Sequence, residues 1–108
     1  MARPGFVRLG LLAVAAQVAV VVAVHASLGS RLPGSDADRR RSARLLFGGI
    51  GVAALGQLAA LGAIGSLRVT PLLSFETALL VQDVGLLVTG VGHAGVLVGL
   101  VVRVRAAD

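Results

Sequence analysis

Residues 45–67, LLFGGIGVAALGQLAALGAIGSL, form a stretch without a charged side chain that is long enough to cross a lipid bilayer as a helix. Crossing about 30 Å of hydrocarbon takes roughly 20 mostly apolar helical residues. Two further segments meet this requirement, at about residues 9–28 and 72–102. With 56% hydrophobic residues in a chain of 108, the sequence predicts an all-α integral membrane bundle of three transmembrane helices, a single membrane domain over residues 1–108.

The arginines gather on one side of the predicted membrane. The segment 29–44, GSRLPGSDADRRRSAR, is expected to be a solvated loop, and with the C-terminal tail it carries seven arginines, against Arg3, Arg8 and Arg68 on the other side. Because short basic loops stay in the cytoplasm, we expect a multi-pass protein of the cell membrane with its N-terminus outside and its C-terminus in the cytoplasm. The arginines expected to set this topology or to contact lipid headgroups are Arg39, Arg40, Arg41, Arg44, Arg103 and Arg105.

The net charge of +5 is explained by this topological role, so we expect no nucleic-acid partner. An alternative interpretation takes residues 1–26 as a signal peptide that is cleaved before Ser27. That cleavage would leave the arginine-rich segment outside, against the charge rule, and the apolar run is longer than the usual 7 to 15 residues. The sequence leaves open whether the first span is cleaved.

Small residues follow one face of the second and third spans. In the second span they recur at steps of four and three and fall within roughly an 80° arc of a helix. These residues are Gly49, Ala53, Gly56, Ala60 and Ala63, and their counterparts in the third span are Gly92, Gly95 and Gly99. Membrane helices associate by close approach of their backbones, so these faces predict helix packing. We expect them to bind a second copy of the chain or a larger membrane protein, which would make the chain an interaction or accessory subunit.

Polar side chains inside the spans form two predicted layers. Counted from the outer edge at about 1.5 Å per residue, Gln17, Gln57 and Asp83 lie about 12, 15 and 10 Å deep, with Gln82 beside them. One interpretation is an interhelical hydrogen-bond cluster in which Asp83 bonds to Gln17 or Gln57. The alternative is a proton or cation conducting subunit in which Asp83 carries the ion, because intramembrane carboxylates are often functional.

The second layer holds His25 and His93, each about 24 Å deep by the same count. We expect imidazoles that are hydrogen-bonded near the inner boundary. A remote alternative is a haem or a metal held by both rings, since imidazole ligates both. The chain has no cysteine, and its glycine runs lie inside apolar helices, without the strand and turn of a phosphate loop. We therefore expect no cofactor, no metal and no enzymatic activity.

The segment from RRRSARLLFGGIGVAALGQLAALG to FETALLVQDVGLLVTGVGHAGVLVGLVVR, residues 39–103, resembles small three-helix membrane proteins of halophilic archaea. The shared features are an entry rich in Arg and Ser, a second helix broken by glycines, and a third helix that opens with an acidic and amide pair, Glu76 and Gln82. The first span matches only in its hydrophobicity. The resemblance implies a three-span fold and assigns no catalytic residue.

Overall fold

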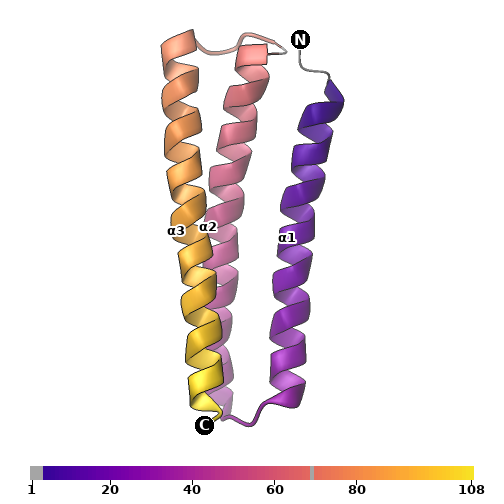
Figure 1. Ribbon diagram of the computed structural model, residues 1–108, viewed down its shortest axis with the longest axis vertical. Helices are drawn as coiled ribbons and strands as arrows, with labels where there is room; N and C mark the ends of the chain where they lie inside the picture. Colours follow the sequence, from indigo (N-terminus) through magenta and orange to yellow (C-terminus); the bar gives the residue numbers. More distant parts are fainter. Residues whose placement is uncertain (1–3, 69) are drawn as a thin grey trace.

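The computed structural model describes residues 4–68 and 70–108, and these residues form three long helices (Figure 1). The helices are α1 (Pro4–Arg31), α2 (Asp36–Arg68) and α3 (Phe75–Ala106). They lie side by side along a body that is 51 Å long, and each is long and apolar enough to cross a membrane. No strand occurs in the described ranges. This architecture confirms the predicted fold, a multi-pass membrane protein built as a three-helix bundle.

The basic connection between α1 and α2 is shorter than the sequence predicted. Helix α2 begins at Asp36 instead of about residue 45, because Ser35 caps it. The N–H of Asp38 donates to Ser35 Oγ at 3.1 Å, and the N–H of Ser35 donates to Asp38 Oδ2 at 3.1 Å, which is a reciprocal capping box. The second of these bonds lowers the pKa of Asp38, which lies outside the apolar part of α2. The run of arginines therefore forms the first turns of α2 and leaves only residues 32–35 as a loop.

Helices α2 and α3 meet along a seam of small residues that repeats every seven positions. The buried residues are Ala78, Gly85, Gly92 and Gly99 on α3, and Ser42, Gly49, Gly56 and Ala63 on α2, with Leu46, Ala53 and Ala60 between the latter. A repeat of seven keeps a seam facing its partner when two helices coil around each other. The backbones touch: a Cβ on Gly49 would lie 2.7 Å from the carbonyl oxygen of Gly92. Glycine is therefore the residue that this approach requires.

The short connection between α2 and α3 is fastened by one buried hydroxyl. Ser66 Oγ accepts hydrogen bonds from the N–H groups of Leu72 and Leu73, at 3.1 and 2.8 Å. Ser74 then caps α3, because its hydroxyl accepts from the N–H of Thr77 at 3.3 Å. These bonds turn the chain sharply and set α3 antiparallel to α2.

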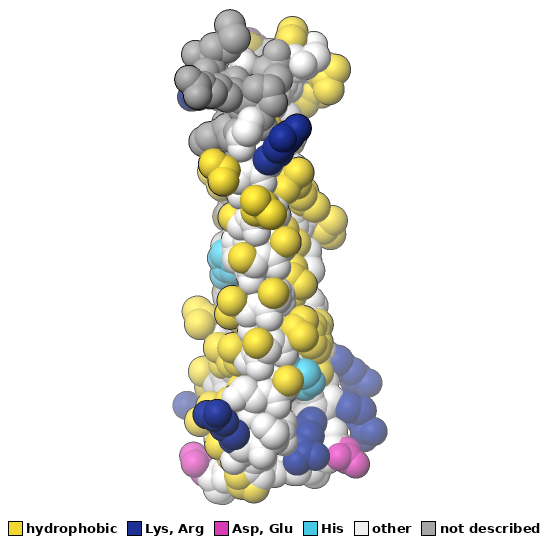
Figure 2. Space-filling view, turned by 90° about the vertical axis from the view of Figure 1, so that its right-hand side faces the viewer, with side chains coloured by type: hydrophobic (Ala, Val, Ile, Leu, Met, Phe, Trp, Pro, Cys, Tyr) yellow, Lys and Arg dark blue, Asp and Glu magenta, His cyan; other side chains and the backbone are white. Residues whose placement is uncertain are grey.

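Helix α1 is held more loosely than the other two. It lies against α2, and Val21 is its one buried side chain among those described, in a cluster with Leu46, Ile50 and Ala53. In the view of Figure 2, hydrophobic side chains cover the middle of the molecule and arginines gather mainly at its lower end. We call this end, where α1 joins α2 and where the C-terminus lies, the arginine-rich end. The exposed apolar middle contacts the lipid bilayer.

Candidate functional site

Three polar side chains, one from each helix, join the helices by hydrogen bonds. The amide nitrogen of Gln57 donates to Gln17 Oε1 at 2.9 Å, and Nε2 of His93 lies 3.0 Å from the same oxygen. Because an amide oxygen only accepts, the Nε2–H group of His93 is the donor in this contact. Gln17 and Gln57 are half-buried, whereas His93 is exposed. The two glutamines are thus brought together, and His93 joins them in place of Asp83.

The direction in which helical side chains lean explains this meeting. A Cα–Cβ bond tilts toward the N-terminus of its own helix. Since α2 and α3 are antiparallel, Gln57 leans toward the arginine-rich end and His93 leans away from it. Gly92, the neighbour of His93, packs against Gly49 and Ala53, and Ala53 lies about one turn from Gln57. The side chains of His93 and Gln57 therefore start at different levels and converge on Gln17. The predicted depth of His93 took no account of this lean.

Asp83 stands apart from the cluster that was predicted for it. It is exposed, and among the described residues no hydrogen bond joins it or Gln82 to Gln17 or Gln57. Asp83 precedes Gly85 by two residues, which places it about 160° around the helix from the seam. Gln82 is half-buried and lines a surface cavity of about 560 Å³ together with Arg68. The prediction that Asp83 bonds to a glutamine within the chain is therefore wrong.

The two histidines are not brought together either. His25 packs edge-on against Phe47, with ring centroids 5.2 Å apart and planes at 73°. His93 is bonded to Gln17, and eight residues of α1 separate Gln17 from His25, about 12 Å along the axis. The imidazoles lie at different levels, so they do not form the pair of ligands that a haem or a metal between them would need.

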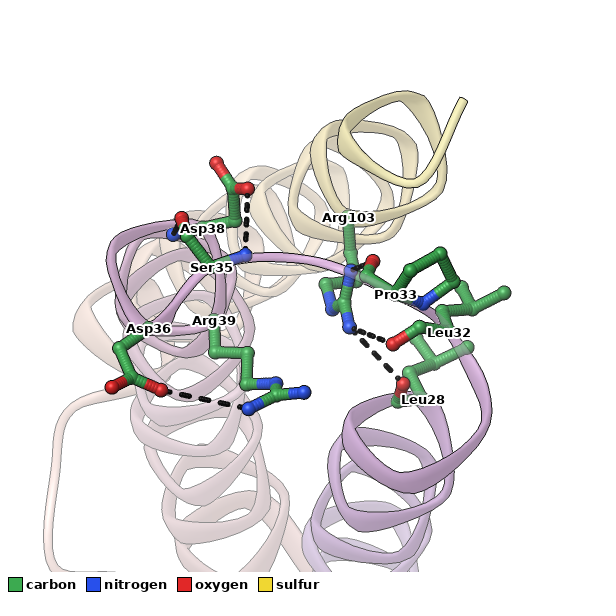
Figure 3. A network of polar contacts seen from close by, with 8 residues as sticks. All are labelled: Leu28, Leu32, Pro33, Ser35, Asp36, Asp38, Arg39 and Arg103. Atoms are coloured by element: carbon green, nitrogen blue, oxygen red, sulfur yellow. Dashed lines mark hydrogen bonds and ion pairs between the residues drawn. The ribbon is translucent and has the colours of Figure 1, made fainter.

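Arg103 forms a buried clamp at the arginine-rich end (Figure 3). Its side chain is 1% exposed. Nη1 donates to the carbonyl of Pro33 at 2.9 Å, and Nη2 donates to the carbonyls of Leu32 and Leu28 at 2.8 and 3.3 Å. The last carbonyls of a helix lack partners within it and carry partial negative charge, so a cation is favourable there. Arg103 was expected to set the topology or to contact lipid headgroups, and its burial excludes the headgroup contact.

The loop beside the clamp has a glycine where the guanidinium of Arg103 approaches it. A Cβ on Gly34 would lie 2.7 Å from Nη1 of Arg103, so the absence of a side chain at this position makes room for the guanidinium. Nothing in the sequence pattern marked Arg103 as different from Arg105, but it follows Gly99 by four residues and thus lies near the seam. That spacing is the signal that could have identified it.

The other arginines at this end remain on the surface. Arg39 forms an ion pair with Asp36 at 3.5 Å, shown in Figure 3, and its side chain is 42% exposed. Besides Arg31, the exposed arginines at this end are Arg40, Arg41, Arg44 and Arg105. For these four, contact with lipid headgroups stays a prediction.

The small-residue faces expected to bind a partner pack against each other within the chain. All five predicted residues of α2 are buried, and so are Gly92 and Gly99. Gly95 is half-buried, and a Cβ there would lie 3.3 Å from the Cα of Gly49. These faces thus form the intrachain seam, and an external partner would have to use another surface.

Comparison of the chain with protein-family models, curated proteins and solved structures finds no match. The resemblance to small membrane proteins of halophilic archaea therefore stays a prediction. Any function has to be argued from the geometry of the chain itself.

Proposed function

We propose that the chain is a non-enzymatic membrane protein that acts by binding another membrane protein through the outward face of α3. This face is a row of exposed residues spaced seven apart, which we call the outward row. Its members are Glu76, Asp83, Gly90, Leu97 and Val104. The observation that carries the proposal is the exposure of Asp83 within an apolar span.

The depth of Asp83 follows from the packing of its neighbours. Gly85 packs against Gly56 and Ala60, so Asp83 is level with about residue 61 of α2. This position is about 10 Å inside the level of Arg68, the last residue of α2. Residues 45–67 contain no charged side chain, and Asp83 therefore lies at the level of the apolar part of α2.

A carboxylate at this depth is expensive when it faces lipid. Aspartate at the centre of a membrane helix costs about 2.5–3.5 kcal/mol on insertion scales, and intramembrane acidic residues almost always face a protein interior or a water-filled cavity. Asp83 instead faces away from α2 and from its own bundle. We infer that the interior it faces is completed by a partner protein.

The orientation of the chain belongs to the same proposal. The arginine-rich end holds the first turns of α2 and the end of α3, and we propose that it faces the cytoplasm, with the N-terminus outside. The partner would then meet Asp83 in the outer half of the membrane. Support for this orientation comes from the bias of the arginines toward one end.

Photocrosslinking in native membranes tests the proposal. A photoreactive residue in place of Leu97 on the outward row should give an adduct of defined mass. Replacement of Leu12 on α1 or Leu55 on α2, which are 65% and 68% exposed, provides matched lipid-facing controls. The adduct should weaken in an Asp83→Leu background, since that variant lacks the polar contact.

Two results would overturn the proposal. Equal crosslinking at all three positions, or none at Leu97, would show that the outward row is not a specific contact surface. Proton or cation flux through liposomes that contain this chain alone, abolished by Asp83→Asn, would instead assign Asp83 to a conducting subunit.

A further inference from the structure

We propose that Asp83 meets a cation: a Lys or Arg side chain on a membrane-spanning helix of a different protein, at the same depth. This inference rests on the proposed function and adds the chemistry of the partner. It is carried by the charge of Asp83, its position on the outward row, and the distribution of cations in the chain.

No described cation of the chain reaches Asp83. Arg68 lies about 10 Å further toward the α2–α3 connection along the axis. Arg8 is exposed on α1, two residues before Gly10, which packs against Leu61. It therefore lies near the level of Asp83 but forms no ion pair with it. The remaining described arginines lie at the arginine-rich end. Among the described residues the one ion pair joins Arg39 to Asp36. A charge removed from water needs an opposite charge and hydrogen bonds, so the cation has to come from outside the chain.

A two-fold dimer of this chain does not supply that cation. In such a dimer, the commonest oligomer, copies inserted in the same direction are related by an axis along the membrane normal, and the interface brings the same surface of both copies together. Through the outward row it would place Asp83 opposite Asp83 and Glu76 opposite Glu76. Two carboxylates that share a site disfavour each other's charged form. The charge pattern of the outward row thus favours a different protein over a two-fold dimer.

The shape of the outward row suits a close ion pair. Aspartate has a shorter side chain than glutamate, so a partner helix must lie closer to α3 to reach it. Gly90 follows Asp83 by two turns in the same row, and a Cβ added there would meet nothing within 4 Å. In contrast to the seam glycines, Gly90 is not used within the chain. A small residue here lets a neighbouring backbone approach the outward row about 10 Å along the helix from the carboxylate.

The test uses the full chain in liposomes with synthetic Leu- and Ala-rich membrane-spanning peptides as probes. One peptide carries a single Lys at the depth of Asp83, and matched peptides carry Leu or Gln at that position or the Lys at the bilayer midplane. Association is measured by energy transfer between a dye on the protein and a dye on the peptide. We expect the Lys peptide to bind about tenfold more tightly than the Leu peptide, which corresponds to about 1.4 kcal/mol.

Variants of the chain make the comparison specific. Asp83→Asn keeps a hydrogen-bonding group but removes the charge, and it should reduce binding of the Lys peptide to the level of the Gln peptide. Asp108→Asn removes an exposed carboxylate at the arginine-rich end, outside the outward row, and should leave binding unchanged. Because Asp83 is exposed, its replacement should not disturb the seam, which circular dichroism of the helices checks.

Three outcomes would overturn the inference. The first is equal association of the Lys, Gln and Leu peptides, and the second is full binding of the Lys peptide by Asp83→Asn. The third is self-association of the chain that disappears in Asp83→Asn, which would identify a second copy as the partner of Asp83. None of the three affects crosslinking at Leu97 in native membranes, so failure of the inference is distinguishable from failure of the proposed function.

Discussion

Replacing Gly92 with Ala should force α2 and α3 apart, whereas the same change at Gly90 should leave them together. At Gly92 the added Cβ would lie 2.5 Å from the carbonyl oxygen of Gly49 and 2.7 Å from the Cα of Ala53. Both are backbone atoms, which no side-chain rotation can move. Since non-bonded carbon contacts are most favourable at about 3.5–4.0 Å, the helices must separate by about 1 Å. Overpacking of this kind lowers the free energy of unfolding by about 1–3 kcal/mol.

Gly90 provides the matched control, because it lies two residues away on the same helix and has open space around it. In a helix interior Ala is favoured over Gly by about 0.5–1 kcal/mol, so Gly90→Ala should be neutral or stabilising. The two variants have the same composition and should therefore shift stability in opposite directions.

Reversible unfolding in mixed micelles measures this difference. Dyes on cysteines introduced at Leu58 of α2 and Leu86 of α3, both exposed, report the separation of the two helices by energy transfer. The chain has no cysteine of its own, so labelling is specific. Equal unfolding midpoints for Gly92→Ala and Gly90→Ala would refute the conclusion that the backbones of α2 and α3 touch.

Three further results are expected. Arg103→Gln should speed hydrogen exchange in the last turn of α1, because the carbonyl of Leu28 in that turn and the carbonyls of Leu32 and Pro33 just beyond it lose the guanidinium, while the exposed Arg105→Gln should not; equal exchange would contradict the clamp. Gln17→Leu and Gln57→Leu should couple by about 0.6–1.7 kcal/mol in a double-mutant cycle, whereas additive effects would argue against their bond. A reporter fused after Arg41 should be cytoplasmic, and an outside signal would reverse the proposed orientation.

The parts of the fold that depend on composition and periodicity could be predicted from the sequence. Three apolar stretches gave three spans, since their length has to match the thickness of the bilayer. The small residues of the second span were correctly assigned to one packing face, because their spacing alone fixes that face. The sequence did not show that this face packs on the glycines of α3, and it left both faces open to an external partner.

Other features depend on contacts between distant segments. Arg103 becomes a clamp because α1 ends beside α3, and the position of that end depends on how sharply residues 32–35 turn. The early start of α2 depends on the bonds between Ser35 and Asp38, which compete with a solvated loop. Arginine is found both in solvated loops and in helices, so the start of α2 could not be placed from the charge of the segment alone.

The face on which Asp83 lies shows why depth along a helix does not determine contacts. The depth was nearly right, because Asp83 is level with about residue 61 of α2, some four residues and about 6 Å from Gln57. Direction decided the outcome: Gln57 follows the seam residue Gly56 by one position and turns toward α1, where it meets Gln17. Asp83 precedes Gly85 by two positions and turns about 160° away from the seam. The spacing of Asp83 from the repeated glycines of α3 already places it on the face opposite the seam, which is the face proposed to meet a partner.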